Sequence, residues 1–192
     1  IVDAMKGHFA SGGTIVQSDR AIGDAPGRTY HARQLLFGTH YLQLPYMWRQ
    51  LTFQMPEDRR ADTPDILEVS LPHWLDDLGL PEELKERVRA AGLAQMVFKA
   101  PTKGLSLHLG FDYAGEHKMG PLSIAMFKAK QAGGLAVQAA LSVARIRTMD
   151  GGKRDVALVI PGPSLHGKST LTISLDFEGS EASKLLALPQ DP

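Results

Sequence analysis

The sequence lacks cysteine and carries no net charge, since 21 Lys and Arg residues balance 21 Asp and Glu residues among its 192 residues. Without cysteine, disulfides and thiolate metal sites are excluded. Near-zero net charge leaves no electrostatic footprint for nucleic acid or an anionic membrane. No apolar run approaches the length of a membrane span, and the first residues do not resemble a secretory signal. We expect a cytoplasmic protein without nucleic-acid or membrane partners, and the sequence indicates no oligomeric state.

Two other kinds of pattern are absent. The sequence has no internal repeat and no low-complexity segment. Six of its histidines show none of the H-x-H or H-x-x-x-H spacings that mark many metal sites, so we expect each of them to be structural or exposed. They are His8, His31, His40, His73, His108 and His117.

The patterns that are present predict a mixed α/β fold. The length and a hydrophobic content of 43% support an ample apolar core. The segment at 81–92 is the clearest helix, with proline at its start, acids first, bases last and glycine at its end; its charges indicate a solvated face. Helices are also predicted at 41–53 and 122–130, strands at 1–5, 31–36 and 65–69, and a hairpin from strands at 95–100 and 105–109.

The most informative motif is Gly162-Pro163-Ser164-Leu165-His166-Gly167-Lys168-Ser169, which has the form G-x-x-x-x-G-K-[ST]. It follows the buried-strand pattern at 155–160. A loop around a polyphosphate needs glycine where its amides approach the oxygens, a lysine for the terminal phosphates and a hydroxyl for magnesium. The alternative is a glycine turn between two core segments. The predicted nucleotide-binding residues are Gly162, Ser164, Leu165, His166, Gly167, Lys168, Ser169 and Thr170.

Several segments occur in the order seen in one enzyme family. These are 1–4, 28–53, 65 onward, Tyr113-Ala114-Gly115-Glu116-His117-Lys118, and the phosphate loop. Together they resemble the ATP-dependent phosphoenolpyruvate carboxykinases over most of the chain. The resemblance implies a substrate-binding N-terminal domain with a mixed sheet, at 1–143, running into the incomplete start of a P-loop nucleotide domain, at 144–192. It also implies that this sequence is an internal piece of a longer polypeptide.

The family resemblance implies a reaction and roles for four residues. Oxaloacetate loses carbon dioxide, and the resulting enolate oxygen attacks the terminal phosphoryl group of ATP, so cations are needed where negative charge develops. Tyr113 would line the substrate pocket and Lys118 would place positive charge near the reacting oxygens. Lys168 would hold the β- and γ-phosphates, and Ser169 would bind magnesium. Without the family, Tyr113 reads as a half-buried aromatic at a hairpin end, and Lys118 as an exposed lysine at a helix start.

The sequence departs from the family where a transition metal, manganese, would bind. Met119 stands in place of a ligating lysine, and Gln138 in place of a ligating histidine. A thioether and an amide are poor substitutes for nitrogen ligands on a hard divalent ion. Inside the loop, Leu165 and His166 replace a glycine–threonine pair; His166 either donates to a phosphate oxygen or is loop surface.

Three hypotheses stay open. The chain is a carboxykinase-like enzyme that acts on a small oxo-acid with ATP and Mg or Mn, a nucleotide-binding relative without that activity, or a P-loop kinase of another acceptor. The long connection expected at 145–154 is either a loop over the site or a surface excursion, and we favour the latter.

Overall fold

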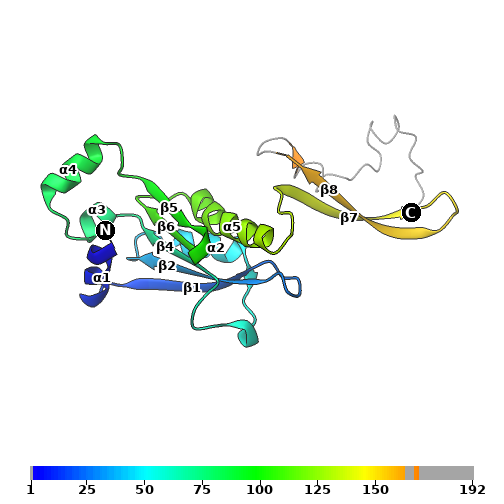
Figure 1. Cartoon of the computed structure of the whole chain (residues 1–192), viewed down its shortest axis with the longest axis horizontal. Coiled ribbons are helices and arrows are strands. Elements are labelled where there is room, and N and C mark those ends of the chain that lie inside the picture. Colours follow the sequence, from blue (N-terminus) through cyan, green and yellow to red (C-terminus); the bar gives the residue numbers. More distant parts are fainter. Residues whose placement is uncertain (1, 163–166, 169–192) are drawn as a thin grey trace. The chain divides into compact units, whose positions relative to one another are not determined.

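The computed structural model describes residues 2–162, 167 and 168, and it divides the chain into two units, Ile1–Ala136 and Val137–Pro192 (Figure 1). The first unit contains a six-stranded mixed sheet with helices, and the second contains a two-stranded antiparallel hairpin. The predicted mixed α/β class is therefore confirmed. Residues 143 and 144, where the sequence places a domain boundary, both lie within one strand of the hairpin.

The first unit alternates strands and helices along most of its length. In chain order its elements are α1 (Val2–Ala10), β1 (Ile15–Ile22), β2 (Tyr30–Phe37), α2 (Gln43–Leu51), β3 (Phe53–Gln54), η1 (Glu57–Arg59), β4 (Ile66–Leu71), α3 (Trp74–Asp77), α4 (Glu82–Ala90), β5 (Met96–Ala100), η2 (Pro101–Lys103), β6 (Leu105–Leu109) and α5 (Ala114–Gln131).

The sheet has a parallel centre and antiparallel edges. Its strand order is β3-β1-β2-β4-β6-β5, with β2, β4 and β6 parallel to one another. Strands β1 and β3 on one side, and β5 on the other, run antiparallel to their neighbours. Strands β5 and β6 form the predicted hairpin, and Gly104 between them has a φ of 67° that favours glycine.

Helices α5 and α2 pack against one face of this sheet. The buried positions of α5 recur at intervals of three and four residues, as one face of a helix requires: His117, Gly120, Pro121, Ile124 and Ala125. Ile124 and Ala125 join a core cluster with Ala32, Trp48 and Ile66. Pro121 lies inside the helix and has no amide hydrogen for the carbonyl four residues before it.

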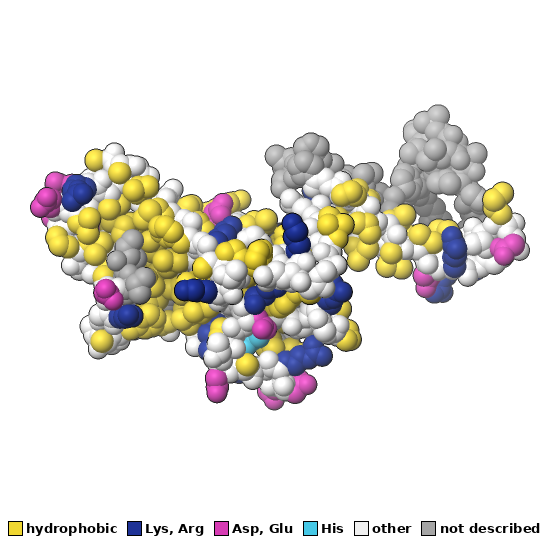
Figure 2. Space-filling view, in the orientation of Figure 1, with side chains coloured by type: hydrophobic (Ala, Val, Ile, Leu, Met, Phe, Trp, Pro, Cys, Tyr) yellow, Lys and Arg dark blue, Asp and Glu magenta, His cyan; other side chains and the backbone are white. Residues whose placement is uncertain are grey.

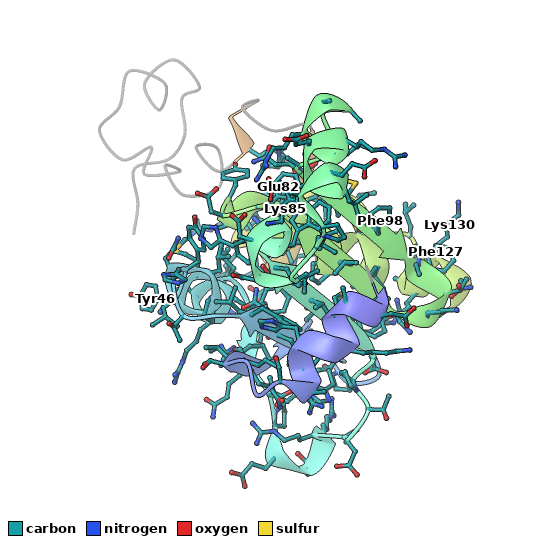
Figure 3. All side chains as sticks on the ribbon, turned by 90° about the vertical axis from the view of Figure 1, so that its left-hand side faces the viewer. Tyr46, Glu82, Lys85, Phe98, Phe127 and Lys130 are labelled. Carbon is teal, nitrogen blue, oxygen red and sulfur yellow. The ribbon has the colours of Figure 1, made fainter. Side chains whose placement is uncertain are left out.

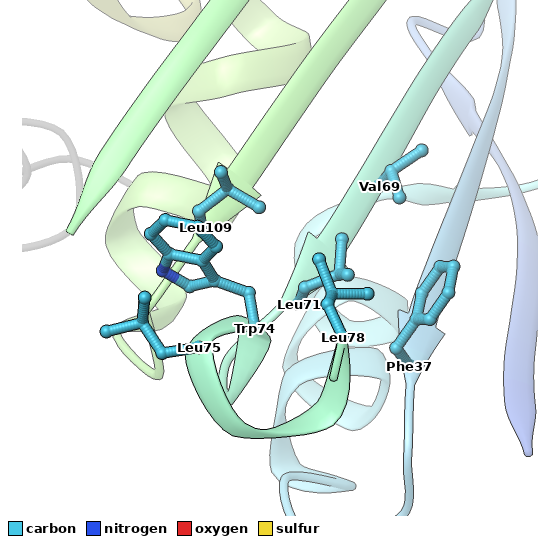
Figure 4. Close-up of a cluster of buried hydrophobic side chains, with 7 residues drawn as sticks. All are labelled: Phe37, Val69, Leu71, Trp74, Leu75, Leu78 and Leu109. Atoms are coloured by element: carbon cyan, nitrogen blue, oxygen red, sulfur yellow. The ribbon is translucent and has the colours of Figure 1, made fainter. Parts of the chain in front are cut away.

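A second apolar cluster lies where α3 meets the ends of the central strands (Figure 4). Trp74 is 2% exposed, and its indole Nε1 donates a hydrogen bond to the Ala94 carbonyl at 2.9 Å. A buried indole with a satisfied N–H gives both apolar contact and a fixed orientation. The cluster consists of Phe37, Val69, Leu71, Trp74, Leu75, Leu78 and Leu109.

Helix α4 confirms the predicted helix at 81–92 and its solvated charges. Pro81 precedes the first helical residue, and Gly92, with a φ of 68°, follows the last turn. Lys85 Nζ lies 3.2 Å from Glu82 Oε2, and the two side chains lie together on the helix surface (Figure 3). Helix α4 has no buried residue, so its ion pairs lie at the surface and contribute little to stability.

Figure 3 also shows Tyr46 pointing outward from α2.

The N-terminal segment corrects the sequence interpretation. We expected a strand at 1–5, but residues from Val2 onward form helix α1, whose Ala4 and Met5 pack against the cluster around Trp74. Five mostly apolar residues do not distinguish a strand from a helix, and Ala and Met favour helix. Strand β1 was not predicted.

Hydrophobic side chains also gather on the surface of the first unit where α1, α3 and α4 lie (Figure 2). Phe9 on α1 and Leu84 on α4 are 42% and 39% exposed. Among the described residues, no helix combines the length and apolar character needed to cross a membrane.

The second unit is a regular hairpin of β7 (Ala139–Arg147) and β8 (Lys153–Pro161). Its turn spans only residues 148–152, so the connection expected at 145–154 is shorter than predicted because both strands extend into it. Strand β8 confirms a strand before the phosphate loop, but most of its side chains are exposed, which corrects the expectation of a buried strand.

A charged network joins β1 to β2. Asp19 Oδ1 accepts hydrogen bonds from Arg33 Nε at 2.7 Å and from His31 Nε2 at 2.8 Å. The Ala61 amide donates to His31 Nδ1, so the Nε2 of a neutral His31 ring carries the hydrogen. Burial alone would raise the pKa of Asp19, but the bonds from Arg33, Gln17 and His31 outweigh burial and lower that pKa to about 2.

This network predicts an acid-sensitive contribution to stability. Because the folded pKa of Asp19 lies below its unfolded value of 3.8, the stabilisation is complete above about pH 4 and is lost as the pH falls towards about 2. We expect Asp19→Asn to lower the free energy of unfolding at neutral pH by about 1–2 kcal/mol in urea denaturation. Asp3→Asn, at an exposed ion pair with Lys6, is the control and should change little. Equal effects of the two substitutions would contradict the network.

Candidate functional site

A row of polar side chains lies on the sheet face that α5 covers. Gln34 on β2, Glu68 on β4 and Ser106 on β6 are paired across the sheet in register, and all three are fully buried. Two positions along, Ser70 pairs with His108, and both are also fully buried. Strand alternation places these residues on one face, while their apolar neighbours face the other.

Helix α5 places His117 directly against this row. His117 Nδ1 lies 2.6 Å from Glu68 Oε1, and the two side chains are 2% and 0% exposed. His117 Nε2 lies 3.3 Å from the Phe111 carbonyl, and Gln34 Nε2 donates to Glu68 Oε1 at 2.9 Å. The carbonyl can only accept, so Nε2 carries a hydrogen, and Glu68 and His117 share one further proton between Oε1 and Nδ1.

His108 completes the cluster. Its Nε2 lies 2.8 Å from Ser106 Oγ, and its ring stacks on His117 with centroids 4.7 Å apart and an angle of 27° between the planes. Glu68, His108 and His117 each offer one ligand atom, and these three atoms all lie within 4.8 Å of one another. We call these three residues the Glu68 cluster.

Burial controls the protonation of the cluster. Desolvation raises the pKa of the Glu68 carboxyl, against the opposing hydrogen bonds from His117 and Gln34. Desolvation also lowers the pKa of His108 to about 3, helped by the positive charges of His117 and Lys99. His108 is therefore neutral at neutral pH, with a lone pair on one ring nitrogen that can bind a cation.

Several polar atoms of this region have no hydrogen-bond partner among the described residues. They are Gln34 Oε1, Glu68 Oε2, Ser70 Oγ and His108 Nδ1. A buried polar group without a partner is costly, so four in one place distinguish this region from an ordinary core.

Gly120 lets the helix approach the cluster closely. A Cβ at this position would lie 2.5 Å from His108 Nε2 and 2.6 Å from Ser106 Oγ. Both distances are shorter than real Cβ contacts, so a larger residue would push α5 away from the sheet.

The two substrate residues that the family resemblance implies lie at the N-terminal end of α5. Lys118 lines a mostly apolar cavity of about 160 Å³ together with Trp48, Phe53 and Leu122. Tyr113 immediately precedes the helix and is 67% exposed, and does not line this cavity.

The predicted nucleotide residues belong to the second unit. The Gly162 amide donates a hydrogen bond to the Gln138 carbonyl at 3.2 Å, so the hairpin places Gln138 beside the start of the phosphate loop. Gly167 has a φ of 73°, and Lys168 is half-buried. The remaining predicted residues, Ser164, Leu165, His166, Ser169 and Thr170, lie outside the described part of the chain.

Comparison with known proteins gives no assignment. No protein-family model and no curated protein matches the chain. Its membership of the carboxykinase family therefore stays a prediction.

Sequence reasoning missed the Glu68 cluster because its members are far apart in the chain. Glu68, His108 and His117 come from β4, β6 and α5, and no short spacing links them. The available signal was the alternation Leu105-Ser106-Leu107-His108-Leu109, in which polar residues occupy every second position. That pattern is typical of a strand with one solvated face, whereas here α5 covers the polar face.

The close approach at Gly120 predicts a specific cost. We expect Gly120→Ala to lower the free energy of unfolding by about 1–3 kcal/mol, because the added methyl group overlaps His108 and Ser106. Gly7→Ala in α1 is the matched control. Nothing lies within 4 Å of the methyl group that this substitution adds, so it should stabilise the protein by about 0.5–1 kcal/mol. Chemical denaturation measures both, and a Gly120→Ala protein as stable as wild type would show that α5 does not pack this closely.

Proposed function

We propose that this protein binds the phosphates of ATP through the loop at 162–170 and acts as a divergent phosphoenolpyruvate carboxykinase. In this reaction a small oxo-acid loses carbon dioxide, and the enolate oxygen takes the terminal phosphoryl group of ATP. The observation that carries the proposal is the passage from β8 directly into Gly162, with Gly167 in a left-handed conformation immediately before Lys168. A glycine with positive φ lets successive amides turn towards one anion, and the next side chain supplies the cation.

The cavity beside Lys118 supports the choice of a small acid as substrate. Its walls are mostly apolar, from Trp48, Phe53 and Leu122, and Lys118 is the lining residue that carries a positive charge. Apolar walls accommodate a short carbon skeleton, and a single cation orients a carboxylate or stabilises an enolate oxygen.

The side chains matched to the family's manganese ligands do not fit that metal. Met119 offers a thioether and Gln138 an amide, and both bind hard divalent ions weakly. We therefore derive no catalytic step through a transition metal. Ser169, the predicted magnesium ligand, lies outside the described residues.

This mismatch favours a second candidate function. A relative that binds nucleotide without decarboxylating an oxo-acid needs the phosphate loop but not the manganese site. A kinase of another acceptor needs the loop and a different acceptor pocket. The three functions share nucleotide binding and differ in what reacts with ATP.

Nucleotide binding is tested first by Lys168→Ala. Removing a charge-assisted contact to the terminal phosphates should weaken Mg–ATP binding about 10- to 100-fold in calorimetry. Lys153→Ala, at the exposed start of β8, is the matched control and should leave affinity unchanged. Equal affinities of wild type and Lys168→Ala would refute phosphate binding by this loop. Oxaloacetate-dependent ADP formation supports the carboxykinase; ADP formed only with another acceptor supports the kinase, and binding without turnover the inactive relative.

The altered metal ligands give a second test. We expect the double substitution Met119→Lys and Gln138→His to raise manganese affinity at least about tenfold, because nitrogen ligands replace sulfur and amide. Met149→Lys with Gln131→His adds the same side chains at exposed positions and should not raise it. Manganese titration followed by electron paramagnetic resonance distinguishes the two. An unchanged affinity in the first variant would show that these positions do not correspond to the family's ligands.

A further inference from the structure

We propose that Glu68, His108 and His117 bind a divalent transition-metal ion of the zinc class, enclosed between the sheet and α5. This inference is independent of the proposed nucleotide function, because every residue involved belongs to the first unit and the phosphate loop belongs to the second. It assigns a second chemical property to the chain.

The donor set is appropriate to such an ion. Two imidazoles and one carboxylate are typical ligands of zinc, and neither calcium nor magnesium prefers imidazole. Donor atoms around a tetrahedral zinc ion lie about 3–3.5 Å apart, given bond lengths near 2.0–2.1 Å. Glu68 Oε1 and His117 Nδ1 lie 2.6 Å apart, and one ligand atom from each of the three residues lies within 4.8 Å of the other two, so these distances bracket that spacing.

The surrounding hydrogen bonds hold each of the two histidines by one ring nitrogen and leave the other nitrogen for the ion. His117 Nε2 donates to the Phe111 carbonyl, which leaves Nδ1 facing Glu68. His108 Nε2 lies against Ser106 Oγ, which leaves Nδ1 without a hydrogen-bond partner in the described chain. Metal-binding histidines in proteins are usually held in this way, with one ring nitrogen donating to a fixed acceptor and the other on the ion.

The carboxylate differs, because the oxygen that accepts from Gln34 is the same Oε1 that lies against His117. Gln34 Nε2 donates to Glu68 Oε1, while Glu68 Oε2 has no partner among the described residues. Gln34 Oε1 and Ser70 Oγ are also buried, lie on the same sheet face and lack described partners, so either can provide an oxygen for a fourth position.

The ion would replace the proton that Glu68 and His117 share. Binding forms bonds from the metal to the carboxylate and to both imidazoles, and it releases that one proton to solvent. Because the three side chains are between 0% and 2% exposed, the resulting site is closed to substrate. A closed site with protein ligands is typical of a structural metal rather than a catalytic one.

The test uses the whole chain, freed of metal by a chelator and titrated with zinc chloride in a calorimeter. We expect one zinc per chain, release of about one proton per zinc at neutral pH, and a higher melting temperature in the zinc-bound protein. Glu68→Gln preserves the size of the side chain and should weaken zinc binding at least about tenfold. His40→Gln with His73→Gln is the matched control, since these two rings lie 5.7 Å apart at another place and should be dispensable.

Cobalt substitution examines the geometry directly. A tetrahedral site with two imidazoles and one carboxylate should give visible cobalt absorption that is lost in His108→Gln and retained in Lys168→Ala. Retention in Lys168→Ala separates this site from nucleotide binding. If a cluster variant fails to fold, X-ray absorption on the wild-type zinc protein should still show two imidazole nitrogens. Absence of bound zinc, loss of zinc in the His40/His73 variant instead, or an all-oxygen coordination shell would overturn the proposal.

Discussion

The architecture of the first unit depends on burying a row of polar side chains under one helix. Gln34, Glu68 and Ser106 lie across three neighbouring strands, and α5 seals them with His117 and with a glycine that permits close approach. The hydrogen bonds that are made, from Gln34 and His117 to Glu68 Oε1, hold α5 against the sheet, while Glu68 Oε2 and three neighbouring polar atoms have no partner among the described residues. The two apolar clusters, on opposite sides of the sheet, then pack around that alignment.

Much of the first unit could be predicted from local patterns. The strands now called β2, β4, β5 and β6 and helices α2, α4 and α5 all overlap predicted segments, because period and end signals are strong there. The sequence did not predict β1, whose residues Gln17, Ser18, Asp19 and Arg20 form a polar run that is satisfied only by pairing with β2. The Glu68 cluster was missed for the same reason: its chemistry exists only after distant strands have paired and a helix has covered them.

The phosphate loop shows the opposite balance between sequence and structure. Its residue types and the strand before it could be predicted directly from the sequence. The structure adds the hydrogen bond between Gly162 and Gln138 and the positive φ of Gly167. The expectation of a buried strand came from the apolar content of 155–160, but in the described part of the chain β8 pairs with β7 alone and most of its side chains are exposed. The apolar content of a segment indicates that its side chains favour burial, but it does not identify the segment that packs against them.

Pro121 removes one main-chain hydrogen bond from the N-terminal part of α5. The residue four positions earlier is His117, whose carbonyl faces a ring nitrogen without hydrogen, so this turn is tied to the remainder of the helix by one main-chain bond fewer. The contact between His117 Nδ1 and Glu68 Oε1, at 2.6 Å, holds this turn against the sheet. His117, which contacts Glu68, is followed directly by Lys118, so one peptide unit separates the buried carboxylate's partner from the wall of the apolar cavity.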